Sequence, residues 1–282
     1  MTAAGDVARR RAEMPDGARE ILDARTLTSA HRRLAEVLAP GMRVLDVGCG
    51  TGAITRGIAG AVAPRGCAVG IDQHSRFMAA ARRAHADVPN LHFAVGDAYA
   101  LPVRPVFDIV SAARVLNWLS APLDALRAMV GAARPGGRVV VLDYNHRKIV
   151  WTPHPPASMR AFYAAFLRWR THAGMDNAIA DHLTEMFAAA GLIRIAASAQ
   201  HEASHRGDPD FDRRVAVWAE VASPAAIRWC PTARSRRPSG PRRKPSTASG
   251  FEITPGRRRS TCSRSRASGR LNHHGLGGSG GR

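Results

Sequence analysis

The sequence predicts an α/β fold in which one parallel β-sheet is covered by helices on both faces. Three observations support this prediction. Short apolar runs alternate with helical patterns, as they do in consecutive β-α-β units. A glycine-rich stretch follows the first apolar run. An acidic residue ends or directly follows each of the next two runs, and ligands of such sheets bind at the carboxyl ends of the strands.

Each predicted element follows from its residue pattern, taken in order along the chain. Residues 19–39 have apolar side chains at helical spacing and are expected to form one leading amphipathic helix. The apolar runs that follow predict five strands, at Arg43–Val47, Ala68–Asp72, His92–Val95, Phe107–Ala112 and Arg138–Asp143. The segments between them predict helices at Ala53–Ala63, Ser75–Ala86 and Pro122–Ala133. Beyond the fifth strand we expect a helical pair at 157–190 and a sixth strand at Leu192–Ala199.

The strongest functional signal is Val44-Leu-Asp-Val-Gly-Cys-Gly-Thr-Gly52, a strand that runs into three alternate glycines. Glycines here permit positive φ and let a ligand lie against bare backbone. Gly48-x-Gly50-x-x-Ala53 also satisfies the looser pattern of nicotinamide enzymes, so the loop alone does not identify the ligand. Asp46, inside the strand end, indicates a cationic ligand rather than a pyrophosphate. Cys49 is expected to fit the tight loop as a small side chain rather than to act as a catalytic thiol.

Two further acidic residues lie at the carboxyl ends of the second and third predicted strands. Asp72 ends the second strand, 20 residues beyond Gly52, where a carboxylate can accept both hydroxyls of a ribose. Asp97 follows the third strand, where its carboxylate and the backbone at Ala98 can read an adenine edge. Each acid alone is also common in turns and helix caps. Because three acids end successive strands, we expect them to meet at one ligand-binding edge.

Five parts of the sequence resemble, in order and spacing, the motifs of class I S-adenosylmethionine-dependent methyltransferases: Val44–Gly52, Asp72, Asp97, Phe107-Asp-Ile-Val110 and Arg134-Pro-Gly-Gly-Arg-Val-Val-Val141. The resemblance covers residues 30–145 and is strongest to the small-molecule group that includes the quinone methylases. It implies a Rossmann-like doubly wound sheet with S-adenosylmethionine as cofactor. The glycine loop would contact the methionine part, Asp72 the ribose and Asp97 the adenine, while Asp46 would orient the amino group. The residues expected to bind the cofactor are Asp46, Gly48, Cys49, Gly50, Gly52, Asp72, Gln73, Asp97, Ala98 and Ala113.

The resemblance also predicts a departure from the family fold. The family sheet has a seventh, antiparallel strand near the carboxyl terminus, and this sequence offers no candidate for it. We therefore expect an open strand edge and a partly uncovered core, which cost roughly several kcal/mol against a typical stability of about 5 to 15 kcal/mol. The methyltransferase domain is expected to span residues 1–227, with core motifs at 43–145 and a helical lid or substrate region at 146–190.

Charge divides the chain into two parts. Residues 228–282 hold thirteen Arg and one Lys against Glu252 alone and so contribute +13 of the formal net charge of +19. Residues 1–227, at +6, are only mildly basic. The tail is rich in Arg, Pro, Ser and Gly, cannot offset its ordering entropy by burial, and is expected to be disordered. We hypothesise that the tail is read from a shifted frame, with a basic arm for RNA as the alternative.

Methyl transfer from a sulfonium requires alignment of the acceptor and exclusion of water. The fifth strand runs into Asp143-Tyr-Asn-His-Arg-Lys148 at the same edge, and we predict that His146 is a catalytic base, with a solvated or capping histidine as the alternative. Aromatic side chains gather at 151–177 and indicate either an apolar acceptor pocket under a helical lid or packing against the sheet. The cysteines and histidines show no metal-ligand spacing, so no metal site is expected.

Two other functions fit parts of the sequence. Tyr144-x-x-x-Lys148 imitates the catalytic spacing of short-chain dehydrogenases and favours an NAD(P)-dependent oxidoreductase, but that pair needs a helix and here follows a strand. The net charge favours an RNA-directed methyltransferase or an RNA-binding protein. The mildly basic charge of residues 1–227 argues against both of these functions. No run of about 18 apolar residues and no signal-peptide core occur, so we expect a cytoplasmic protein without a membrane partner. The prediction is therefore an enzyme that methylates a small molecule; nucleic acid is not expected as a partner, and the oligomeric state stays open.

Overall fold

The computed structural model describes residues 19–212, 214–216 and 218. All of them lie within one unit of the chain, Met1–Arg236. The basic tail at 228–282 lies outside the described residues. Its disorder, its shifted frame and the domain boundary at residue 227 therefore stay predictions.

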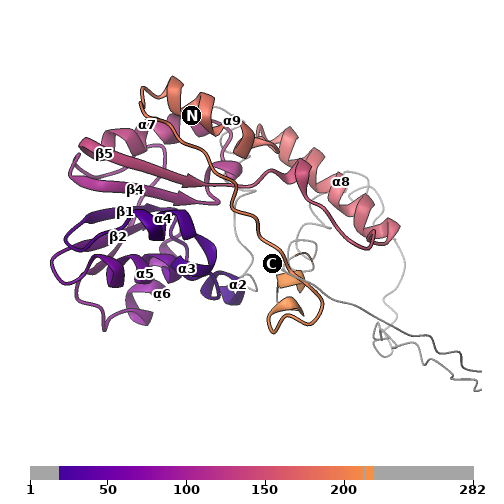
Figure 1. Cartoon of the computed structure of the whole chain (residues 1–282), viewed down its shortest axis with the longest axis horizontal. Helices are drawn as coiled ribbons and strands as arrows, with labels where there is room; N and C mark the ends of the chain where they lie inside the picture. The colour runs from indigo at the N-terminus through magenta and orange to yellow at the C-terminus, as the bar shows by residue number, and fades with distance from the viewer. Residues whose placement is uncertain (1–18, 213, 217, 219–282) are drawn as a thin grey trace, which may run out of the picture. The chain divides into compact units, whose positions relative to one another are not determined.

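Five parallel strands form the sheet, in the order β3-β2-β1-β4-β5 (Figure 1). Their bounds are β1 Arg43–Val47, β2 Cys67–Asp72, β3 Leu91–Val95, β4 Phe107–Ala113 and β5 Ala133–Leu142. All five predicted strands are present, and β5 begins earlier than the predicted Arg138. The strand order reverses between β1 and β4, where a doubly wound sheet opens a crevice for its ligand.

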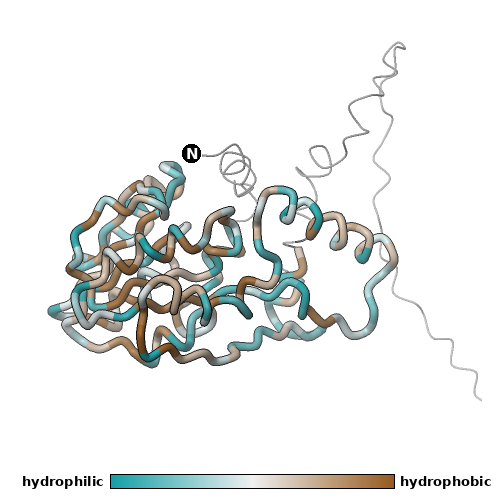
Figure 2. The backbone as a smooth tube through the Cα atoms, turned by 90° about the horizontal axis from the view of Figure 1, so that it is seen from above, coloured by the Kyte–Doolittle hydropathy of each residue, from teal (hydrophilic) through white to brown (hydrophobic). Residues whose placement is uncertain are grey.

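Helices cover both faces of the sheet, as the sequence pattern predicts. In Figure 1, α5 (Ala53–Val62) and α6 (Ser75–Ala84) lie on one side of the strands, and α7 (Pro122–Ala132) and α9 (Ile179–Ala189) lie on the other. The alternation of side chains along β1 serves both cores, because Val44 packs with α5 and α6 whereas Leu45 packs with α7. Figure 2 shows apolar stretches, in brown, running through the region of the sheet.

The leading helix predicted at 19–39 is three short helices instead, α2 (Arg19–Asp23), α3 (Leu27–Ala30) and α4 (Arg32–Val37). Thr26 begins α3, because its side chain accepts a hydrogen bond from the Ser29 N–H in a capping box. His31 separates α3 from α4 with φ −148° and ψ 57°. Its buried ring places Nε2 3.2 Å from the Ser111 hydroxyl of β4. Local capping and this anchor to the sheet divide the helix that the apolar spacing predicted.

The predicted helical pair is present as α8 (Ala157–His172) and α9, but the sixth strand predicted at Leu192–Ala199 is wrong. Residues 192–199 pair with no strand of the sheet. Apolar residues form a strand only when a neighbouring strand supplies the ladder of hydrogen bonds, and none does so here. Residues 192–206, which we call the crossing segment, run instead past the carboxyl ends of the strands (Figure 1).

β5 is an open edge in the part of the chain that the structure describes. It pairs with β4 alone, and none of its residues is buried, whereas four of the five residues of β1 are. This agrees with the uncovered edge expected for a sheet without the seventh strand. Among the described residues, no helix is long and apolar enough to cross a membrane.

Candidate cofactor and acceptor site

A cavity of about 3270 Å³ opens at the carboxyl ends of the strands. Residues that follow each of the five strands contribute to its wall, together with α8 and the crossing segment. Pockets for single small ligands occupy about 300 to 1000 Å³. The cavity therefore has room for a nucleoside-sized ligand and a second molecule beside it.

Three glycines shape the loop after β1. Gly48, Gly50 and Gly52 all have positive φ, at +70°, +55° and +82°. A Cβ atom added at Gly48 would lie 2.4 Å from a methyl group of Val115. A Cβ atom at Gly50 would meet no atom closer than 3.6 Å, although Gly50 lies on the cavity wall. The loop is therefore tightly packed at Gly48 and presents bare backbone to the cavity at Gly50.

Asp72 connects this loop to the end of β2. Its Oδ2 accepts a hydrogen bond from the Gly50 N–H at 3.0 Å, and its Oδ1 accepts one from the His74 N–H at 2.9 Å. The ring of His74 also places Nδ1 2.8 Å from Asp72 Oδ1. Oδ2 has a single partner and can still accept a hydroxyl group of a ligand, because a carboxylate oxygen has more than one lone pair. Asp97 follows β3, and its Oδ1 accepts a hydrogen bond from the Tyr99 N–H at 3.0 Å. Both acids line the cavity beside the glycine loop.

Asp46 lies behind the loop and not on the cavity wall. Its carboxylate faces α5, where the Thr55 hydroxyl donates to Oδ2 at 2.7 Å. Burial raises the pKa of Asp46 to about 7, which the Thr55 hydrogen bond opposes and the charge of Asp72 reinforces. The expectation that all three acids meet at one edge is therefore corrected for Asp46, because the alternation of β1 turns its side chain toward α5.

Seven of the ten residues expected to bind the cofactor line the cavity: Gly48, Gly50, Asp72, Gln73, Asp97, Ala98 and Ala113. Asp46, Cys49 and Gly52 do not. Burial raises the pKa of the Cys49 thiol well above its usual value, and the charges of Asp46 and Asp72 act in the same direction. A raised pKa favours the protonated thiol, which suits packing better than nucleophilic attack. That Cys49 is not a catalytic thiol stays a prediction. That these ten residues bind a cofactor stays a prediction.

His146, the predicted base, lies on another part of the same cavity wall, in the short 3-10 helix η3 (His146–Lys148). Its Nδ1 lies 3.2 Å from the Tyr163 hydroxyl, which donates to the His146 carbonyl at 2.9 Å. Burial, followed by the charge of Arg170, lowers the pKa of His146 to about 3. The ring is therefore neutral at neutral pH and is better suited to accept a hydrogen bond than to hold a proton.

Arg170 of α8 is a fully buried cation behind this part of the wall. Its Nε donates to the Asn177 side-chain oxygen at 2.8 Å, and its Nη2 donates to the Asn117 carbonyl at 2.5 Å. Its guanidinium carbon lies 4.9 Å from the ring centre of Trp118 and 5.5 Å from that of Phe166. Burial lowers the pKa of Arg170 to about 10, so it stays charged at neutral pH. No pattern in the sequence marks this residue, because one arginine in an aromatic helix is ordinary.

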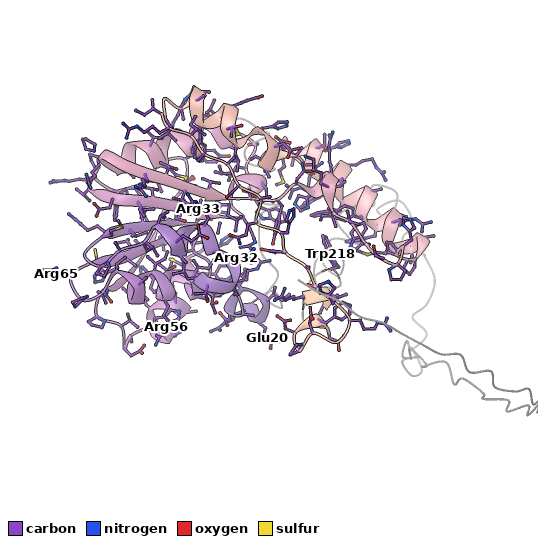
Figure 3. All side chains as sticks on the ribbon, in the orientation of Figure 1. Glu20, Arg32, Arg33, Arg56, Arg65 and Trp218 are labelled. Atoms are coloured by element: carbon purple, nitrogen blue, oxygen red, sulfur yellow. The ribbon has the colours of Figure 1, made fainter. Side chains whose placement is uncertain are left out.

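The aromatic side chains of α8 pack against one another and also line the cavity, so the acceptor pocket and the packing role both stay predictions. Tyr163 and Phe166 are buried and pack against other rings, while Phe166 and Trp169 also line the cavity. Trp218, labelled in Figure 3, places its ring centre 5.3 Å from that of Tyr163. This part of the cavity is therefore an apolar, aromatic wall.

A second polar cluster, which sequence reasoning missed, holds the crossing segment in place. Arg114 follows β4 with φ +61°, which is uncommon for a residue with a side chain. Its Nε donates to the Tyr144 hydroxyl at 2.6 Å, and its Nη2 pairs with Glu202 of the crossing segment. Tyr144 also donates to Glu202, at 3.0 Å, and Arg32, labelled in Figure 3, donates to the His201 carbonyl at 3.4 Å. No pattern marks these contacts, because their partners are far apart in sequence.

The other functional patterns of the sequence find no matching geometry among the described residues. Tyr144 bonds to Arg114 and Glu202, whereas Lys148 pairs with Asp181 at 2.9 Å, so the two do not present the joint face that a dehydrogenase pair requires. In the described part of the chain, no three His, Cys, Asp or Glu side chains are placed to hold a metal ion.

Comparison with known proteins finds relatives that match part of the chain. A 2-phytyl-1,4-naphtoquinone methyltransferase from Thermosynechococcus vestitus is 36% identical over 110 residues, which are 39% of this chain and 49% of the relative. The ubiquinone/menaquinone biosynthesis C-methyltransferase UbiE of Ectopseudomonas mendocina is 37% identical over 110 residues, 38% of this chain and 43% of the relative. The chain thus spans less than half the length of these two curated relatives.

A solved S-adenosylmethionine-dependent methyltransferase from Aquifex aeolicus superposes with a TM-score of 0.48 at 20% identity, covering 62% of this chain and 88% of that one. Residues 38–191, more than half of the sequence, match the family described as a methyltransferase domain. They include every strand of the sheet and both helices of the pair after β5. The chain therefore belongs to the methyltransferase domain family.

Proposed function

We propose that this protein transfers a methyl group from S-adenosylmethionine to a small-molecule acceptor. One observation carries the proposal. The Gly48–Gly52 loop, Asp72 and Asp97 come from the ends of three neighbouring strands and meet on the wall of one cavity. Bare backbone beside two carboxylates fits a nucleoside with a cationic tail better than it fits a pyrophosphate, which would be repelled by the acids.

The residues present fit S-adenosylmethionine. The open backbone at Gly50 would lie against its methionine part, Asp72 would accept the ribose hydroxyls, and Asp97 with Ala98 would read the adenine. Asp46, behind the loop, would act through its charge, because a cationic ligand nearby favours the ionised form of a buried acid. When bound, the cofactor supplies a methyl group that its sulfonium already activates for displacement.

The remaining task of the protein is to align the acceptor and exclude water. The aromatic wall on α8 provides an apolar surface for a flat molecule, and the crossing segment narrows the opening through its contacts with Arg114 and Tyr144. The two quinone methyltransferases among the relatives act, by their names, on naphthoquinone and ubiquinone or menaquinone precursors. They support a planar aromatic acceptor here. A cytoplasmic location and the absence of a nucleic-acid partner stay predictions from the sequence.

Calorimetric titration of the full chain with S-adenosylhomocysteine, and separately with NADPH, tests the proposal. We expect saturable binding of S-adenosylhomocysteine near one molecule per chain and no saturable binding of NADPH. Asp87→Asn, on the surface opposite Arg56, is a matched control that should leave the titration unchanged. Binding of NADPH without binding of S-adenosylhomocysteine would instead support the oxidoreductase. In a further titration with RNA, binding with a steep salt dependence, together with binding of neither small ligand, would support the RNA-binding alternative.

A further inference from the structure

Buried polar atoms without partners gather on the α8 side of the cavity. Among the described residues, eight buried side-chain nitrogen or oxygen atoms lack a hydrogen bond, and four of them belong to Asn117, His146 and Arg170. His146 is 7% exposed and Asn117 is 1% exposed, and both line the cavity. A buried polar atom without a partner is unfavourable by about 1–3 kcal/mol. A ligand that supplies the missing hydrogen bond should therefore bind more tightly than one of the same shape that cannot supply it.

The hydrogen bonds of Tyr163 determine which nitrogen of His146 carries a proton. The Tyr163 hydroxyl has one proton, which it donates to the His146 carbonyl at 2.9 Å. The 3.2 Å contact between the same hydroxyl and His146 Nδ1 is then a hydrogen bond only if Nδ1 donates. Because the ring is neutral, Nε2 carries no proton and has a free lone pair. This lone pair is one of the four unpartnered sites.

The charges at this part of the wall favour a neutral acceptor. Arg170 is fully buried and lies against Trp118 and Phe166. The Asp143 carboxylate, which lines the cavity, accepts from the backbone N–H groups of Asn117 and Tyr144, and the charge of Arg170 favours its ionised form. The two opposite charges offset each other, and an ionised acceptor would lose its hydration against the apolar part of the wall. The rings beside Arg170 favour a flat molecule.

We propose that His146 and Asn117, which we call the hydroxyl-reading pair, bind a phenolic or enolic hydroxyl of a planar acceptor. The hydroxyl donates to His146 Nε2, and the Asn117 amide supplies the neighbouring hydrogen bond. Arg170 is a positioning residue, because it donates to the Asn117 carbonyl and to the Asn177 side chain. The Asn177 backbone carbonyl in turn accepts from the His146 N–H at 2.9 Å. This inference rests on the proposed function and selects phenols and enols over amines as acceptors. It requires no proton to be stored on His146.

Three naphthalene probes test the pair in the full chain saturated with S-adenosylhomocysteine. 2-Naphthol donates a hydrogen bond, 2-methoxynaphthalene has the same ring but no donor, and 2-(aminomethyl)naphthalene is a cation at neutral pH. We expect 2-naphthol to bind about tenfold tighter than the ether, as the loss of one hydrogen bond implies, and the cation to bind most weakly. His146→Phe keeps an aromatic ring and should remove the preference. His172→Gln, which changes an exposed histidine at the end of α8, should retain it.

The tautomer of His146 provides a second readout that does not depend on any binding measurement. A long-range ¹H–¹⁵N spectrum of the wild-type protein should show a histidine with protonated Nδ1 and unprotonated Nε2, whose signals are absent from His146→Phe. Equal binding of 2-naphthol and the ether, or a proton on Nε2 of His146, would overturn the inference. The proposed function is tested separately, by binding of S-adenosylhomocysteine. If S-adenosylhomocysteine binds but 2-naphthol is not preferred over the ether, only the hydroxyl-reading pair is refuted.

Discussion

Replacing Asp46 by Asn should stabilise the ligand-free protein, and the gain should grow as the pH rises. Asp46 is 2% exposed, and burial raises its pKa from the ordinary value of 3.8 to about 7. Between these two values the unfolded chain carries the ionised acid while the folded protein carries the protonated acid. Unfolding then releases a proton, so the stability of the wild-type protein falls with rising pH and levels off above about pH 7.

The size of the effect follows from the pKa difference. About 3 pKa units at 1.36 kcal/mol each amount to about 4 kcal/mol at alkaline pH, of which about 3 kcal/mol appear between pH 5 and pH 8. The Asn side chain can still accept the 2.7 Å hydrogen bond from Thr55. Its amide N–H groups lack a partner there, which costs about 1–3 kcal/mol independent of pH. The change with pH, rather than the absolute gain, is therefore the diagnostic quantity.

Urea unfolding of the wild-type protein and Asp46→Asn at pH 5 and pH 8, followed by tryptophan fluorescence, measures this change. Other titrating groups are common to both proteins, so they largely cancel in the difference of the two free energies of unfolding. Asp87→Asn, at an exposed surface site, is the control and should show little change between the two pH values. A stability difference between wild type and Asp46→Asn that is the same at both pH values would refute the reasoning.

Three further substitutions test the loop, the second-strand acid and the crossing segment. Gly48→Ala should destabilise the protein by about 1–3 kcal/mol in a thermal melt and abolish binding of S-adenosylhomocysteine, because the new Cβ meets Val115 at 2.4 Å. Asp72→Asn should weaken S-adenosylhomocysteine binding at least about tenfold by calorimetry, because a carboxylate accepts both ribose hydroxyls better than an amide does. Glu202→Gln should speed limited proteolysis within residues 192–206 severalfold, because it weakens the charged contact that holds this segment.

Gly60→Ala and Glu185→Gln are matched controls for the loop and the crossing segment, and Asp87→Asn is the control for Asp72→Asn. Gly60→Ala lies in α5 with no atom within 4 Å of the new Cβ and should be neutral or stabilising by up to about 1 kcal/mol. Glu185→Gln changes an exposed glutamate of α9 and should leave the proteolysis rate unchanged. Wild-type affinity for S-adenosylhomocysteine in Gly48→Ala or Asp72→Asn would contradict the proposed cofactor site. An unchanged digestion pattern in Glu202→Gln would contradict the role of the crossing segment.

The elements predicted from the sequence are those whose signal is local. β1 is a short apolar run followed by three glycines, and both the strand and the positive φ of the glycines follow from that spacing. The helices α5 and α7 likewise follow from apolar spacing along single segments. Residues 192–199 carry the same kind of local signal and yet form no strand, because a strand also needs a partner that the local sequence does not supply.

The sequence by itself determined the five strands and the helices between them along the chain. It also determined the glycine loop and the acids that end β2 and follow β3, because each of these depends on residues adjacent in the chain. Only the tertiary structure decided that Asp46 turns away from the cavity, that Tyr163 leaves Nε2 of His146 free, and that Arg170 lies behind Asn117. These properties depend on which distant side chains pack together. Burial and pairing, not residue identity, set their charges and hydrogen bonds.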